Sequence, residues 1–357
     1  MTVREMREQV SKFLSPLSSV SEIYLHGGEP LLAGKQFFRE FVAAVRTSSA
    51  GRDVKIGVQT NGVLIDEEWV QLFMEGGMKV GLSLDGDAAI NDMHRVGLDG
   101  RSTYRQVKRG IEVLQKHAVA FGVISVFSNE VAKKSGCAYR VLRHMSELGI
   151  SEFDLHPAFT PFETSGNASN HNVEPLHYSS FMSSAFDEWL AIDGEKPLVR
   201  TFEDFFLAIG GTNSDVCHRS GQCMSIIGVN EGGEMQPCTR PFDPLYAFGN
   251  LNATAFAEVV DTRGFRAFRL AELAGQALTA SCKWRDFCGN GGCPHERFSN
   301  GTQDPGGRHV FCTCHGGDRG GYPELFEHIA CRIMSLTDHV PTRADAHCHD
   351  FVRSPTH

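Results

Sequence analysis

Short apolar segments alternate with amphipathic helical segments through the first 155 residues, and this alternation is the strongest constraint on the fold. Strands that alternate with helices of about 10 to 15 residues form βαβ units, in which helices cover a parallel sheet. We expect strands at residues 23–25, 55–59, 79–84, 120–125 and 153–155, with helices before, between and after them. The expected fold class is therefore α/β, with ligands bound at the carboxyl ends of the strands.

Polar segments that contain glycine follow three of these expected strands: Gly27–Pro30, Gln59–Gly62 and Ser83–Gly86. Glycine lets the backbone approach a ligand closely, and Glu, Asn, Ser and Asp supply hydrogen-bond partners. Any one of these segments is also compatible with an ordinary helix cap or turn. Three of them at corresponding strand ends favour a shared binding rim.

Composition and charge exclude several classes of protein. The formal net charge is −9 and no basic run is present, which argues against a nucleic-acid partner. The longest strongly apolar stretch, residues 118–127, is far shorter than the ~18 residues of a membrane helix. Residues 1–8 lack the apolar core of a secretory signal, so we expect a cytoplasmic protein without a membrane partner.

The cysteines are concentrated in the second half of the chain. Of the eleven, only Cys137 lies in residues 1–216. Cytosolic thiols stay reduced, so this concentration favours metal binding over disulfides. Zinc sites usually contain Cys-x2–4-Cys pairs, whereas several spacings here are longer, as between Cys217 and Cys223. Iron–sulfur clusters are therefore favoured, and a zinc-stabilised interaction module is the alternative.

The three strand-end segments, with His94-Arg95 downstream, resemble the core of radical S-adenosylmethionine (SAM) enzymes, especially the branch of sulfatase maturases and peptide cyclophane synthases. This resemblance covers about residues 1–160 and implies a partial (β/α)6 barrel. In the family, the glycine-rich segment holds the methionyl amino group of SAM, and polar residues surround its carboxylate and ribose. Carried over by position, the cofactor-binding residues are Gly27, Gly28, Glu29, Pro30, Asn61, Ser83, Asp85 and Arg95.

The cysteine-rich half resembles the SPASM extension, which holds two auxiliary 4Fe–4S clusters in this family. The resemblance assigns one cluster to Cys217, Cys223, Cys238 and Cys293, and three ligands of a second to Cys282, Cys288 and Cys312. It also implies three parts: a radical SAM core at 1–200, a SPASM domain at 201–315, and a C-terminal helix and tail at 316–357.

Two positions depart from the family pattern. Thr279 stands where a further cysteine of the second cluster is expected, so that cluster is held by three cysteines, completed by Cys314 or another group, or absent. Thr239 stands where some sulfatase maturases carry a base, which argues against sulfatase maturation as such. One extra residue also separates Cys288 from Cys293.

The family holds its SAM-cleaving cluster with a Cys-x3-Cys-x2-Cys loop after the first barrel strand, yet this sequence has no cysteine before Cys137. Without that strand, residues 23–25 would form an unpaired apolar edge, so we expect about 25 to 40 further residues upstream of Met1. The alternative is a catalytically inactive relative that keeps auxiliary clusters and binds a peptide.

The resemblance implies an oxidoreductase that modifies a ribosomally made precursor peptide. In this chemistry a 5′-deoxyadenosyl radical abstracts hydrogen from the substrate, and we expect a cross-link as the product. The expected cofactors are SAM and 4Fe–4S clusters, and the expected partners are the precursor peptide and an electron donor such as a flavodoxin or ferredoxin. The sequence assigns no catalytic acid or base.

Overall fold

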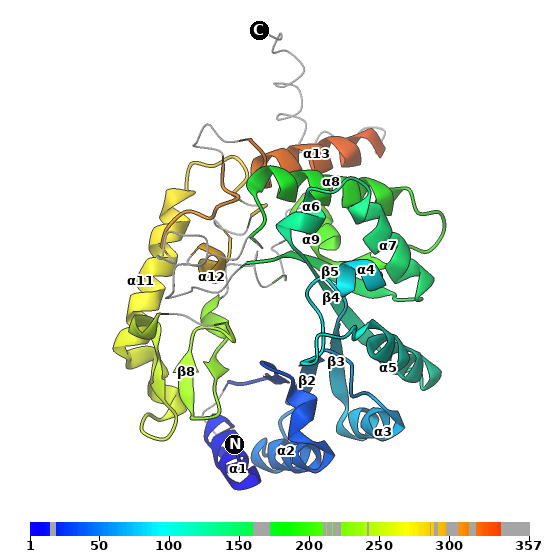
Figure 1. The fold of residues 1–357 in the computed structure, drawn as a ribbon. Helices are drawn as coiled ribbons and strands as arrows, with labels where there is room; N and C mark the ends of the chain where they lie inside the picture. The colour runs from blue at the N-terminus through cyan, green and yellow to red at the C-terminus, as the bar shows by residue number, and fades with distance from the viewer. Residues whose placement is uncertain are drawn as a thin grey trace. The chain divides into compact units, whose positions relative to one another are not determined.

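A computed structural model shows that the protein folds into two compact units (Figure 1). Unit 1 comprises Met1–Ser125 and Ile226–Phe268, and unit 2 comprises Val126–Ser225 and Arg269–His357. The domain boundaries expected from the sequence, near residues 200 and 315, stay a prediction. The structure describes residues 1–14, 19–159, 172–209, 212, 216, 223–240, 243–285, 287–288, 292–297, 306–313 and 319–336.

Six strands form the main sheet in the order β1-β2-β3-β4-β5-β6, which confirms the expected α/β fold class. The pairs β1–β2, β2–β3, β3–β4 and β5–β6 are parallel. The strands are β1 (Glu22–Leu25), β2 (Lys55–Thr60), β3 (Met78–Ser83), β4 (Phe121–Phe127), β5 (Glu152–Pro157) and β6 (Leu198–Val199). A small antiparallel sheet in unit 1 contains β7 (Gly228–Val229), β8 (Glu234–Gln236) and β9 (Gly249–Asn250).

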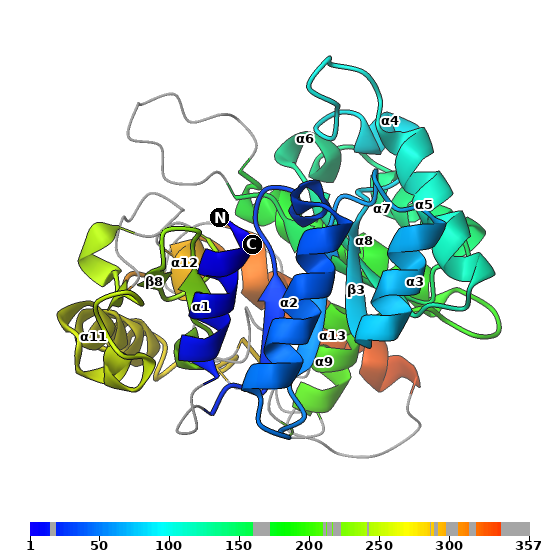
Figure 2. The same cartoon turned by 90° about the horizontal axis from the view of Figure 1, so that it is seen from below.

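Helices connect the strands of the main sheet. In unit 1, neighbouring helices α1 to α3 pack against one another along the sheet, and α5 packs against α3 (Figures 1 and 2). The helices are α1 (Val3–Phe13), α2 (Lys35–Ser48), α3 (Glu67–Gly76), α4 (Ala88–Asn91), α5 (Tyr104–Lys116), α6 (Asn129–Ala132), α7 (Cys137–Glu147), α8 (Pro175–Leu190), α9 (Arg200–Ile209), α11 (Arg263–Leu278), α12 (Pro294–Arg297) and α13 (Gly321–Leu336). Among the described residues, no helix has both the length and the apolar character needed to cross a membrane.

Most elements lie where the hydrophobic pattern predicts them. Helix α5 has the expected bounds, and α1 begins with the expected capping box between Thr2 and Glu5. Strand β4 runs to Phe127, two residues beyond its expected end. The Phe127 carbonyl accepts a hydrogen bond from the Ala158 N–H, and its ring stacks on Phe181 of α8 with centroids 4.2 Å apart. These tertiary contacts extend the strand. A local sequence pattern could not predict them, because Ala158 and Phe181 lie far from Phe127 along the chain.

The Asn61-Gly62 turn is packed against α5 through Gly110. A Cβ added at Gly110 would lie 2.6 Å from the backbone oxygen of Gly62, closer than real Cβ contacts allow. The position therefore requires glycine even though alanine is the better helix former. The close approach matters because this turn follows β2 at the predicted binding rim.

We predict that Gly110→Ala destabilises the protein by about 1–3 kcal/mol, because the overpacking outweighs the roughly 1 kcal/mol gain in helix propensity. Urea unfolding followed by far-UV circular dichroism measures the change. Gln106→Ala, at an exposed position of the same helix, should change stability by less than about 0.5 kcal/mol. A stabilised Gly110→Ala protein would show that α5 does not approach the turn this closely.

Candidate functional site

The segment after β1 turns through two glycines with positive φ angles. Gly27 has φ +94° and Gly28 has φ +53°, backbone angles that residues other than glycine rarely adopt. A Cβ added at either position would meet no atom within 4 Å. The backbone turn therefore requires the glycines, and the space beside them is open. This is a suitable arrangement for main-chain contacts to a ligand.

The Glu29 carboxylate ties this glycine segment to the end of β2. Its Oε1 accepts hydrogen bonds from the Leu31 N–H at 3.0 Å and from the Thr60 hydroxyl at 2.7 Å. Its Oε2 accepts the Asn61 N–H at 2.7 Å. Both carboxylate oxygens thus accept hydrogen bonds from the protein, so Glu29 holds the ends of β1 and β2 together. Pro30 then begins the 3-10 helix η1 (Pro30–Ala33), which Glu29 caps.

Asp85 and Arg95 form an ion pair just after β3. The Arg95 Nε donates to Asp85 Oδ2 at 2.7 Å, and the Asp85 side chain is only 5% exposed. The Ser125 hydroxyl donates to the Asp85 carbonyl at 3.0 Å, and the Thr103 hydroxyl donates to the Arg95 carbonyl at 2.8 Å. Hydrogen bonds to backbone and side chain therefore fix both members of the pair.

Ser83 ends β3 and accepts a hydrogen bond from the Gln59 side-chain amide, 3.2 Å from its hydroxyl oxygen. The structure thus joins Glu29 to Asn61 and Asp85 to Arg95, and it ties Ser83 to β2. Sequence reasoning missed two residues outside the predicted segments that hold these groups: Thr103, and Asn91, whose Oδ1 accepts the Asp85 N–H at 3.3 Å. Their polar side chains in the stretch after β3 are the signal that the sequence offers.

His26, between β1 and the glycines, is a further residue that the motif assignment passed over. Burial and, after it, the positive charge of Arg240 lower the pKa of His26. The side chain is exposed, and charge and desolvation both favour the neutral form of the ring. A neutral imidazole can accept or donate a hydrogen bond at this edge of unit 1.

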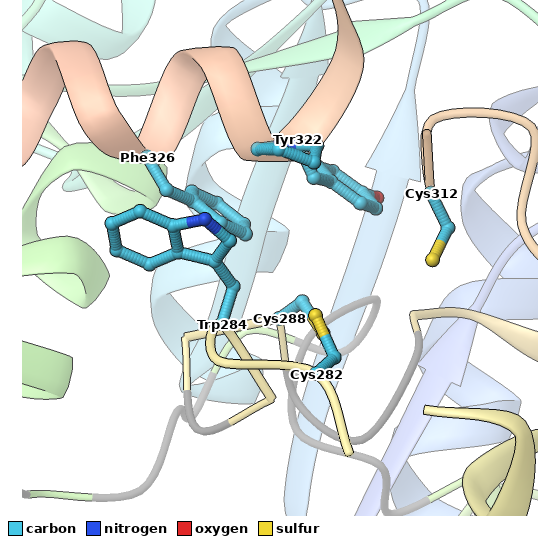
Figure 3. Close-up of a pocket in the computed structure, with 7 residues that line it drawn as sticks. Cys282, Trp284, Cys288, Cys312, Tyr322 and Phe326 are labelled. Carbon is cyan, nitrogen blue, oxygen red and sulfur yellow. The ribbon is translucent and has the colours of Figure 1, made fainter. Parts of the chain in front are cut away.

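Three of the predicted cysteine ligands line one pocket in unit 2. Cys282, Cys288 and Cys312 line this pocket, and Figure 3 shows Cys282 and Cys288 beside each other and Cys312 on a separate segment. Its remaining lining is apolar: Trp284, Tyr322, Pro323 and Phe326. Within the described residues, no group of three or more His, Cys, Asp or Glu residues is close enough to hold a single metal ion.

The segment that carries Cys312 is anchored by a buried pair of polar side chains. His309 and Glu296 are at most 2% exposed, and His309 Nε2 lies 2.9 Å from Glu296 Oε2. The Phe311 N–H donates to His309 Nδ1 at 3.0 Å, so the ring proton is on Nε2 and points to the carboxylate. The Cys312 N–H donates to the His309 carbonyl at 2.9 Å, which completes the turn.

The structure leaves the four-cysteine set untested. Cys217 lies outside the described residues, Cys238 belongs to unit 1, and Cys223 and Cys293 belong to unit 2. Cys238 lies just after β8 and has its sulfur 4.0 Å from the Thr239 hydroxyl. This ligand set therefore stays a prediction.

We predict that Arg240→Gln raises the pKa of His26, because it removes a positive charge that disfavours the imidazolium ion. An NMR titration of the histidine rings measures the pKa, with His26→Gln to assign the signal. Since the folded pKa is below that of the unfolded chain, stability should fall as the pH falls through the unfolded value of about 6.5. The matched control is Arg4→Gln, at a highly exposed arginine of unit 1. If Arg240→Gln and Arg4→Gln changed the pKa of His26 equally, Arg240 would not be the specific cause of the lowered pKa.

Known proteins are similar in sequence to most of this chain. Residues 1–132 match the radical SAM superfamily. A serine-type anaerobic sulfatase-maturating enzyme of Klebsiella pneumoniae is 30% identical over 271 residues, which cover 75% of this chain and 67% of that protein. A cysteine-type anaerobic sulfatase-maturating enzyme of Clostridium perfringens strain 13 is 25% identical over 339 residues, 94% of this chain and 88% of that protein.

Two solved structures have the same fold as this chain. Native anSMEcpe with bound AdoMet (SAM) superposes with a TM-score of 0.83 at 24% identity, covering 95% of this chain and 90% of that one. The same enzyme with AdoMet and the Cp18Cys peptide also has a TM-score of 0.83, covering 94% and 91%. The chain therefore belongs to the radical SAM superfamily, in the branch of the SPASM-type anaerobic sulfatase-maturating enzymes.

Proposed function

We propose that this protein is a radical SAM oxidoreductase that modifies a ribosomally made precursor peptide by hydrogen abstraction and forms a cross-link in it. The observation that carries the proposal is the fixed strand-end arrangement of unit 1, in which Glu29 joins the glycine turn to the end of β2 and the Asp85–Arg95 ion pair lies just after β3. Similar proteins are named as sulfatase-maturating enzymes, and one similar structure contains a peptide, which supports a peptide as substrate.

The chemistry of this arrangement suits SAM. The open backbone of Gly27 and Gly28 offers carbonyl and N–H groups to the methionyl amino and carboxylate groups. Ser83 and the Asp85–Arg95 pair supply a hydroxyl and charged groups for the carboxylate and the ribose, and the Asn61 segment completes the rim. When bound beside a reducing iron–sulfur cluster, SAM supplies a 5′-deoxyadenosyl radical that abstracts hydrogen from the substrate.

The cysteine-rich half would hold auxiliary iron–sulfur clusters, because three thiols of unit 2 already share one apolar pocket. We infer that these clusters accept electrons from, or deliver them to, the substrate, and that a flavodoxin or ferredoxin is the external electron donor.

Thr239 favours cross-linking over sulfatase maturation. It follows the predicted ligand Cys238 directly. A threonine hydroxyl does not accept a proton near neutral pH, unlike the base that some sulfatase maturases carry at this position. The proton acceptor of this protein is therefore a different group, or its substrate differs.

We predict that co-expression with a precursor peptide encoded beside the gene gives a product lighter by two hydrogen atoms. Tandem mass spectrometry should show no fragmentation between the two linked residues. A sulfatase-derived peptide is the comparison substrate. Binding of the precursor without any mass change would favour the non-catalytic alternative, and modification of only the sulfatase peptide would contradict cross-linking.

We predict that Gly28→Val weakens SAM binding at least tenfold, about 1.4 kcal/mol, because a branched side chain destabilises the left-handed turn and fills the open space beside it. Isothermal titration of the chain with SAM measures the affinity. Gly100→Val is the matched control, since Gly100 also has a positive φ of +73° and open surroundings. An unchanged affinity for Gly28→Val, or an equal loss in both variants, would place the SAM site elsewhere.

A further inference from the structure

Residues 96–102, between α4 and α5 of unit 1, form a short hairpin with an exposed apolar tip (Figure 2). Val96 and Ser102 pair in an antiparallel bridge that closes the hairpin. Leu98 at the tip is fully exposed, and Val96 is 47% exposed. The hairpin therefore presents a small apolar centre to the solvent.

The two ends of this hairpin are fixed beside the candidate SAM site. Arg95 comes directly before it and forms the ion pair with Asp85. Thr103 comes directly after it, and its hydroxyl donates to the Arg95 carbonyl at 2.8 Å. A helix that connects two parallel strands begins at the edge of the sheet where the first strand ends. The hairpin and the first turns of α5 therefore lie at the same edge as the glycine turn.

The first turns of α5 carry two arginines whose charges are not balanced. Arg105 and Arg109 are exposed and lie four residues apart on one face of the helix. Within the part of the chain that the structure describes, neither forms an ion pair. The other charged side chains of the hairpin and of these turns do form ion pairs, Arg101 with Asp99 at 3.6 Å and Lys108 with Glu112 at 4.0 Å. On a chain with a formal net charge of −9, this surface is locally positive.

The surface formed by the hairpin, Arg105 and Arg109, which we call the hairpin face, suits a folded acidic partner. Peptides usually bind in a groove or beside a free strand edge. Here Val96 and Ser102 already pair with each other, and the arginines lie on the outer face of a helix. An apolar centre beside positive charges is complementary to a protein that presents an apolar contact among acidic side chains. Small, charge-dependent contacts of this kind are typical of electron-transfer complexes.

We propose that the hairpin face binds an acidic one-electron carrier protein of the flavodoxin type, which supplies electrons to the candidate SAM site. The inference rests on the proposed function, which requires such a donor. The carrier loses one electron, and SAM gains it and separates into methionine and the 5′-deoxyadenosyl radical. Electron transfer slows steeply with distance, and the hairpin face lies at the edge where the glycine turn lies. Leu98 supplies the apolar contact, and the arginines attract and orient the carrier.

The test is the binding of a purified, oxidised flavodoxin to the full chain, measured by biolayer interferometry at low and at physiological ionic strength. Arg105→Gln with Arg109→Gln should weaken binding roughly five- to tenfold at low ionic strength, mainly through slower association, and should reduce its salt dependence. Arg105→Lys with Arg109→Lys keeps both charges and should retain the affinity. Leu98→Ala should weaken binding about threefold or more at both ionic strengths, mainly through faster dissociation.

The matched control is Arg4→Gln with Arg39→Gln, which removes two positive charges from exposed positions on α1 and α2 of unit 1. This control should bind flavodoxin as the unsubstituted chain does, and cytochrome c, a basic one-electron carrier, should not bind the hairpin face. An equal loss in the control and in the Arg105 and Arg109 variant would overturn the proposal. So would a variant that binds flavodoxin normally but binds the precursor peptide less tightly, because the hairpin face would then bind the substrate.

Titration of the same samples with SAM separates this inference from the proposed function. The Arg105 and Arg109 variant should bind SAM as the unsubstituted chain does, because neither arginine is among the predicted SAM-binding residues. A chain that binds SAM but not flavodoxin would overturn only this inference. A chain that binds flavodoxin through the hairpin face but does not bind SAM would overturn only the proposed function.

Discussion

The hydrogen bonds of the Glu29 carboxylate are the interaction on which the candidate SAM site depends. One side chain joins the turn after β1 to the Thr60 hydroxyl and the Asn61 N–H at the end of β2. Parallel strands end at the same edge of a sheet, but their loops need a further constraint to take a single shape. Glu29 supplies it, because a carboxylate accepts several hydrogen bonds and each is strengthened by its charge. The glycine turn can then stay open, since its shape does not depend on side-chain packing.

In the cysteine-rich half, too, contacts between side chains fix the position of a loop. A cluster site needs thiols from distant segments at defined positions, and loops alone do not fix such positions. In unit 2, the buried His309–Glu296 pair and the stacked rings of Phe311 and Tyr178 hold the segment that ends in Cys312. The turns after α11 hold Cys282 and Cys288 through backbone hydrogen bonds. Each unit therefore uses hydrogen bonds between polar groups to hold a short segment at its candidate ligand site.

Much of the fold could be predicted from local patterns. The capping box at Thr2 and Glu5 and the full extent of α5 follow from residue spacing, because helix signals lie within a few residues of one another. Strand β4 was predicted too short, since the contacts of Phe127 with Ala158 and Phe181 come from other parts of the chain. Within the candidate site, the order of the motifs predicted the strand-end residues, whereas Thr103 and His26 were not predicted. Their roles arise only when separate strand ends lie side by side.

The sequence by itself determined the alternation of strands and helices, the glycine turn after β1 and the concentration of cysteines in the second half. These features depend on side-chain type and spacing, which a linear chain contains in full. Only the tertiary structure decided that Glu29 uses both carboxylate oxygens on the protein and that three cysteines share one apolar pocket. Each of these depends on which donors and acceptors meet across long stretches of chain, and that is fixed by packing in three dimensions.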